Sequence, residues 1–274
     1  MTFAAVLLTA SLLALAPPVA AQTSGDPPPS TLTLDRMDSA SRAGIQVGFD
    51  KLDRIKLSDG FVMRFEPYGQ YVLPNRAFGI YGMISMAHVF DLNGEDATGT
   101  GNLELGGFFL PFHDSRLVIR AGLDLPTASD ASREFIANVY GVYERMTDFM
   151  LIAPNTTALR LSVSTLQESG VAFFRGDLGL DLAIDKPSGN DAVYMHANLA
   201  AGVRLPSVDL SAELVNVADL EASGDVTDKF IHTLAFGLRT RGSHQFCAGM
   251  VFPLDKGIRG EIWIFSLGYQ YAVN

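Results

Sequence analysis

The chain has 274 residues, a formal net charge of −10 and a single cysteine, Cys247. The negative charge disfavours nucleic-acid binding, which requires a basic face, and a lone cysteine cannot form an internal disulfide. No stretch beyond the N-terminal region offers 18 uncharged apolar residues, which excludes a helical membrane protein. Even so, 48% of the residues are hydrophobic and the mean hydropathy is +0.20, which is high for a soluble exported protein.

The N-terminal region has the composition of an export signal followed by a tether. An apolar run from Phe3 to about Leu15 precedes Pro-Pro and a small-residue ending, which predicts a signal peptide over 1–21, cleaved near Ala21. No Lys or Arg precedes the apolar run, so a buried or membrane helix is the alternative. The Pro/Ser-rich stretch that follows predicts a periplasmic tether over 22–42, which leaves 43–274 as one domain.

The stretch LVIRAGLDLPT, residues 117–127, shows the pattern that dominates the rest of the chain. Every second residue from Leu117 is apolar, whereas Arg120 and Asp124 fall on the other face. A helix would place both charges on the same stripe as Leu117, so the alternation indicates a strand. We expect about twelve such strands, at 43–50, 60–73, 77–90, 99–112, 115–127, 157–166, 170–184, 192–205, 208–217, 229–239, 244–254 and 260–272.

The connections between these strands alternate between tight turns and longer loops. This alternation suits an even-stranded antiparallel barrel with both termini at the tight-turn end, which is periplasmic in outer-membrane barrels. A soluble barrel with its apolar face inward would show the same periodicity. Strand length, aromatic residues near strand ends and the export signal favour the membrane barrel. The sequence therefore predicts a porin-like transmembrane β-barrel in the outer membrane of a Gram-negative envelope.

If the apolar face contacts lipid, the charged face lines the lumen. Six cations, all of them Arg, then stand against seven carboxylates. They could form an ion-pair network that holds the barrel shut, a charged constriction that selects solutes, or both. The predicted lumen residues are Arg64, Glu66, Glu104, Arg120, Asp124, Arg160, Arg175, Asp177, Asp181, Arg204, Asp209, Glu213 and Arg239.

Two hairpins are expected to carry cross-strand ion pairs. A two-residue turn at Pro206-Ser207 would place Arg204 opposite Asp209, and a turn at Glu168-Ser169 would place Arg160 opposite Asp177.

The longest loop, 128–156, carries its own pattern. A capping signal at Ser129 or Asp130 precedes apolar residues from Phe135 to Met146 at helical spacing. We expect a short amphipathic helix in an extracellular loop, which either packs on the barrel rim or folds into the lumen as a lid.

The sequence contains no pattern that favours catalysis or metal binding. A barrel phospholipase needs a His and a Ser two apart on one strand, but His113-Asp114-Ser115 is expected to form a tight turn. The histidines have no spacing suited to zinc, and no nucleophile or phosphate-loop motif is present. We therefore expect neither an enzyme nor a cofactor.

The hairpin 99–127 resembles that of transporter-like outer-membrane barrels of the phenol-degradation meta-pathway family. Their Gly-x-Gly-Asp/Asn-Leu opening is matched from Gly99 to Leu103, and their Gly-x-x-Leu-Pro-Thr-Gly ending is matched from Gly122 to Thr127. Ala128 replaces the last Gly, and Asn102 stands where Asp is usual. The resemblance implies uptake of small molecules, apolar or aromatic ones among them.

The predicted function is passage or facilitated uptake of small molecules, with outer-membrane lipid and solutes as the partners. The rival interpretation is a non-conducting barrel with a structural or adhesive role. Its acidic loops would then face outward (Asp91, Glu95, Asp96, Asp219, Glu221 and Asp225). The sequence does not give the substrate or the oligomeric state.

Overall fold

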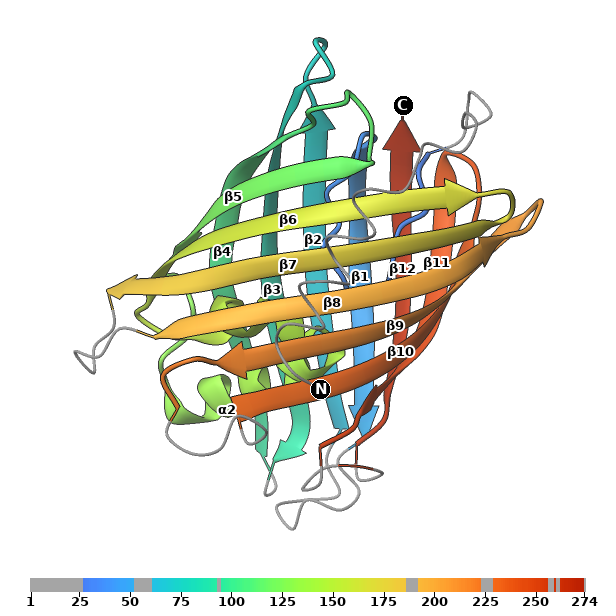
Figure 1. The fold of residues 1–274 in the computed structure, drawn as a ribbon. Helices are drawn as coiled ribbons and strands as arrows, with labels where there is room; N and C mark the ends of the chain where they lie inside the picture. The colour runs from blue at the N-terminus through green and yellow to red at the C-terminus, as the bar shows by residue number, and fades with distance from the viewer. Residues whose placement is uncertain are drawn as a thin grey trace.

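The computed structural model describes residues 27–51, 61–92, 95–185, 192–222, 229–255, 259 and 262–273. Twelve antiparallel strands form a closed barrel in which each strand pairs with its neighbours in sequence and β1 pairs with β12 (Figure 1). The strands are β1 (Ser41–Lys51), β2 (Phe61–Val72), β3 (Phe78–Leu92), β4 (Glu95–Phe109), β5 (Leu117–Leu125), β6 (Thr157–Ser169), β7 (Ala172–Asp185), β8 (Val193–Arg204), β9 (Val208–Asp219), β10 (Phe230–Thr240), β11 (His244–Pro253) and β12 (Ile264–Val273). The predicted twelve-stranded barrel is confirmed.

The barrel has an inverted distribution of polarity. Along β5, Arg120 and Asp124 are buried, whereas Ile119 and Leu123 are about two-fifths exposed. The same alternation places charged and amide side chains inside and large apolar side chains outside around the wall. A soluble barrel would have the opposite arrangement, so the apolar outer face is that of a transmembrane barrel.

Aromatic side chains lie near the strand ends, as the sequence predicts for a membrane girdle. Tyr71, Phe78, Phe112 and Tyr271 are each 45–54% exposed. Among the described residues, no helix is long and apolar enough to cross a membrane.

The long loop between β5 and β6 contains the helix α2 (Ser132–Gly141) and two 3-10 turns, η1 (Val142–Glu144) and η2 (Met146–Ile152). The predicted short helix is therefore present, although no side chain caps its N-terminus. In Figure 1 this helix lies within the barrel, toward the end opposite the C-terminus. It contacts β1, β2, β3 and β4, and η2 contacts β4, β9 and β3.

Two features differ from the sequence prediction. Residues 27–40 were expected to belong to an exposed tether, but they are almost entirely buried against the inner wall. The β3–β4 connection is shorter than expected, because the two strands extend to Leu92 and Glu95. The predicted signal peptide, 1–21, lies outside the described residues, as do residues 22–26 of the tether.

Candidate functional site: the filled lumen

The structure places all thirteen predicted lumen residues on the inner face of the barrel. Twelve are buried, and Arg204, near the tight-turn end, is half-buried. The strand period of two accounts for this placement, because each residue lies at an inward position of its strand.

Most of these residues are joined by ion pairs. Glu104 is the centre of the largest group: its carboxylate accepts from Arg120 and from Arg160, whose Nη1 lies 2.7 Å from Glu104 Oε2. Further pairs join Arg64 to Glu66, Arg160 to Asp181 and Arg175 to Asp177. Asp124 is buried beside this group, yet neither of its oxygens has a hydrogen-bond partner in the described part of the chain. Arg239 is held through Nη2 by the carbonyl of Thr31.

One of the two predicted cross-strand pairs is present and the other is wrong. Arg204 lies opposite Asp209, with Nε 3.5 Å from Oδ1. Arg160 lies opposite Asp181 rather than Asp177, because the β6–β7 turn is formed by residues 170 and 171. Gly170 has a φ of +60°, a conformation that glycine adopts without the strain it imposes on other residues. The resulting shift keeps every side chain on its expected face but changes its partner.

Residues 27–40, here called the lumen segment, run along the interior as an inward hairpin. Arg204 Nη2 and Arg42 Nη2 donate to the carbonyls of Pro27 and Pro28, and Ser39 N donates to Ser115 Oγ, so both ends lie near the tight-turn end. The tip is held deeper in the lumen. Glu213 accepts three hydrogen bonds there, from Leu32 N, Thr33 N and Thr33 Oγ1, each at 2.7 Å.

The 128–156 loop fills the lumen from the other end. Gly99 and Gly101 permit this close approach, because a Cβ atom at either position would lie 2.2 Å from Glu134 O or 2.7 Å from Leu151 O, respectively. Asn102 anchors the loop: its Nδ2 donates to the carbonyls of Met150 and Ala153, and its Oδ1 accepts from Ala128 N. The rim-packing alternative is therefore wrong, and the loop forms an inward plug.

The lumen segment and the loop plug meet inside the barrel. Arg145 donates from Nη1 to Leu32 O at 2.7 Å and from Nη2 to Leu34 O at 3.1 Å, while Thr147 Oγ1 lies 3.1 Å from Thr33 O. Leu34 also packs in one apolar cluster with side chains of the loop. Each insert thus covers polar groups of the other, and the two occupy the interior of the barrel together.

The inserts add charged groups that sequence reasoning missed. Asp35 pairs with Arg120, Arg36 with Glu66, and Asp148 with Arg145, Arg64 and Arg160. The only sequence signal was the apolar Leu32 and Leu34 beside charges at 35, 36 and 38, in a region otherwise typical of a tether.

Three carboxyl groups of the inserts have shifted pKa values. Burial alone would raise the pKa of Asp35, but the positive charges of Arg120 and Arg160 and the hydrogen bond from Ser162 together outweigh it, and the pKa lies below its usual range. Burial likewise acts against ionisation of Asp148, but Arg145 and Arg64 hold its pKa well below the ordinary value. Glu144 differs, because burial raises its pKa despite Arg64 nearby and hydrogen bonds from Ser266 and Gln46.

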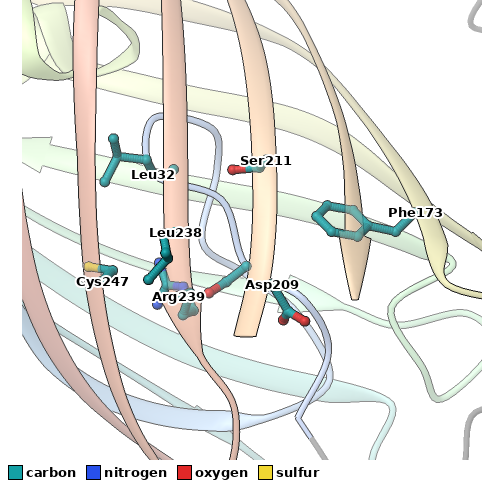
Figure 2. A pocket seen from close by; sticks show the side chains of 9 residues that line it. Leu32, Phe173, Asp209, Ser211, Leu238, Arg239 and Cys247 are labelled. Carbon is teal, nitrogen blue, oxygen red and sulfur yellow. The ribbon is translucent and has the colours of Figure 1, made fainter. Parts of the chain in front are cut away.

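A small cavity lies beside the lumen segment. Its volume is about 10 Å³, room for about one water molecule. Figure 2 shows the side chains that line the cavity, among them Leu32 of the lumen segment and Phe173, Asp209 and Arg239 of the wall.

The side chains of the His-x-Ser pattern at 113–115 make other contacts. His113 lies in a turn with Nδ1 3.2 Å from Asn75 O, and Ser115 Oγ bonds with Ser39. Within the described ranges, no group of three or more His, Cys, Asp or Glu side chains could hold a metal ion.

No family model matches this chain, and no curated protein has a matching sequence. Among solved structures it is similar to the COG4313 outer membrane channel from Pseudomonas putida F1, with a TM-score of 0.56 at 12% identity over 90% of this chain and 99% of that one. Weaker likenesses include the translocator domain of autotransporter NalP from Neisseria meningitidis (TM-score 0.47, 10% identity, 86% and 88% covered) and the CymD monoaromatic hydrocarbon channel (0.45, 9%, 87% and 90%). At these identities the likeness to the first structure shows the fold: that of an outer-membrane β-barrel.

Proposed function

We propose that the barrel is an outer-membrane channel for passage or facilitated uptake of small molecules, closed in this state by the lumen segment and the loop plug. The observation that carries the proposal is the nature of the closure. Polar and ionic contacts hold a segment that joins the barrel through β1, so its withdrawal would break no strand–strand hydrogen bond. The likeness in fold to a barrel described as a channel supports the same interpretation.

The solute class follows from two different arguments. The meta-pathway resemblance of 99–127 would make the chain a member of that family and favour apolar or aromatic molecules. The arginines and carboxylates of the lumen favour a polar or charged solute, because an apolar solute would displace water from these charged groups and offer them no hydrogen bond in return. We propose that the thirteen inward residues form the constriction in either case.

The non-conducting structural barrel is the second candidate, and the filled lumen favours it. In that case the ion-pair network and both inserts would stabilise the wall permanently. The acidic side chains at the long-loop end would then form the functional face, and Asp91, Glu95 and Asp96 are exposed there. Asp225, also named in that interpretation, lies outside the described residues.

Current recordings from purified protein in planar bilayers, with solute-driven swelling of loaded liposomes, test the proposal. We expect small, intermittent conductance and uptake of either a charged or an apolar probe. The gel mobility of unheated and heated samples shows whether the barrel is folded. Absence of both current and swelling in folded protein would reject the channel and favour the structural role.

We propose an outer-membrane location and no chemistry. The chain is exported after cleavage near Ala21, resides in outer-membrane lipid with both termini periplasmic, and uses no cofactor, catalytic residue or nucleic-acid partner.

A further inference from the structure

Two adjacent residues of the lumen segment occupy two chemically opposite cradles in the barrel wall. The Asp35 carboxylate accepts from Arg120 Nη1 and from Ser162 Oγ, on β5 and β6. The Arg36 guanidinium donates to the Glu66 carboxylate on β2 and, at 2.8 Å, to Gln46 Oε1 on β1.

A third wall residue completes the cation cradle. The ring of Tyr68 lies 4.1 Å from the Arg36 guanidinium carbon, within the range of a cation–π contact. The backbone near the anion cradle is also bound, because Asp35 N donates to Asp177 Oδ2 at 2.9 Å. The wall thus holds an anion, a cation and an N–H donor at the spacing of neighbouring residues.

All these wall groups belong to strands, so they remain in place if the lumen segment withdraws. Withdrawal of a charged side chain from buried polar partners costs those partners a charge-assisted hydrogen bond, which is unfavourable. Arg120 would keep Glu104, and Glu66 would keep Arg64. Ser162 Oγ, Gln46 Oε1 and the Tyr68 ring would each lose the charged group of the segment that they contact. A solute that supplied both charges would restore the contacts that the segment makes.

We propose that the opened lumen binds a small zwitterion carrying a carboxylate and a guanidinium or ammonium group, as in amino acids and short peptides. The carboxylate lies against Arg120 and Ser162, and the cation lies against Glu66, Gln46 and the Tyr68 ring. The lumen segment is then an internal competitor for this site. This inference rests on the proposed channel function and names its substrate class.

Solutes with one or both charges separate this site from general charge effects. L-arginine carries both groups, agmatine lacks the carboxylate, and propionate lacks the cation. In planar bilayers we expect L-arginine to interrupt the ion current at concentrations at least tenfold lower than either comparator. Equal block by L-arginine and agmatine would overturn the proposal.

Variants assign the two cradles. Ser162→Ala should weaken block by L-arginine relative to block by agmatine, and Tyr68→Leu should weaken block by both solutes. Ser85→Ala is the matched control, because Ser85 is buried on β3 with no hydrogen-bond partner in the described part of the chain. Block that is unchanged in both cradle variants would also overturn the proposal.

A second measurement does not depend on conduction. If L-arginine competes with the lumen segment, it should speed deuterium exchange of peptides covering 31–36 at least several-fold more than agmatine or propionate does. Faster exchange in a barrel that passes no current would support the site and reject the channel. Exchange that L-arginine leaves unchanged would reject the site, whether or not the barrel conducts.

Discussion

Glu213 offers a quantitative test of how firmly the lumen segment is held. Its carboxylate accepts hydrogen bonds from Leu32 N, Thr33 N and Thr33 Oγ1, each at 2.7 Å and all in buried surroundings. A hydrogen bond to a charged group contributes about 1.5–3 kcal/mol. Glu213→Gln keeps the shape and one acceptor oxygen, but turns an amide NH₂ toward a donor and removes the charge.

We expect the substitution to weaken docking of the segment tip by about 2–3 kcal/mol, the equivalent of one lost charge-assisted bond. Since every 1.4 kcal/mol is a factor of ten in an equilibrium constant, the tip should open about 30–150 times more often. Deuterium exchange of peptides containing Leu32 and Thr33, measured by mass spectrometry on the folded barrel, should accelerate by that factor.

Asp209→Asn is the matched control, because Asp209 lies on the same face of β9 and faces Arg204 and Arg241 instead of the tip. Exchange that changes less than about threefold in Glu213→Gln, or equally in both variants, would refute the assignment of Glu213 as an anchor of the tip.

Three further predictions concern the loop plug, the wall and the orientation. Burial raises the pKa of Glu144, so the contribution of this group to docking of the loop is present at low pH and is lost as pH rises through the raised value. Deuterium exchange of peptides from 142–152, measured between pH 4 and 8, should therefore accelerate with pH in the unsubstituted protein beyond the intrinsic rate, and Glu144→Gln should remove this acceleration. The same pH profile in both proteins would contradict the prediction. Gly122→Ala should destabilise the barrel by about 1–3 kcal/mol in urea unfolding, because the new Cβ would lie 2.1 Å from the Tyr81 hydroxyl oxygen. Gly107→Ala should have less effect, because the atom nearest to its Cβ would be 3.4 Å away. Equal effects of the two substitutions would reject overpacking as the cause. In a Cys247→Ser background, an impermeant thiol reagent on intact cells should label Ser132→Cys and not Ser207→Cys, and the opposite result would reverse the orientation.

The strands and their faces were predictable because both depend on local pattern. A period of two assigns a side to every residue of a strand once one residue is placed, and Arg120 on β5 shows this directly. Register was less secure, because it depends on which residues form the turn. The predicted turn at Pro206-Ser207 is confirmed, whereas the predicted turn at Glu168-Ser169 is wrong, because the chain turns at Gly170, a residue suited to positive φ.

The filling of the lumen could not be predicted from local pattern. Leu32 and Thr33 bond to Glu213, about 180 positions away in sequence, and no periodicity marks such partners. The wall binds the lumen segment mainly through hydrogen bonds and ion pairs. The segment therefore needs few apolar residues, and its sequence lacks the periodicity of a strand or a helix. The loop helix was expected, but its amphipathic pattern suits a rim and a lumen equally.

A disulfide between the tip of the lumen segment and the barrel wall tests the central claim, that withdrawal of this segment opens the channel. A Cβ atom at position 237 would lie 3.7 Å from Leu32 Cβ, within the 3.5–4.5 Å range of disulfides. The variant Leu32→Cys/Gly237→Cys, with Cys247→Ala to remove the third thiol beside this position, would fix the tip to β10 when oxidised. Single-channel recordings should show no openings in the oxidised protein and openings after reduction, with Leu32→Cys/Cys247→Ala indifferent to reductant. Equal conductance before and after reduction, with the disulfide verified by mass spectrometry, would contradict the claim.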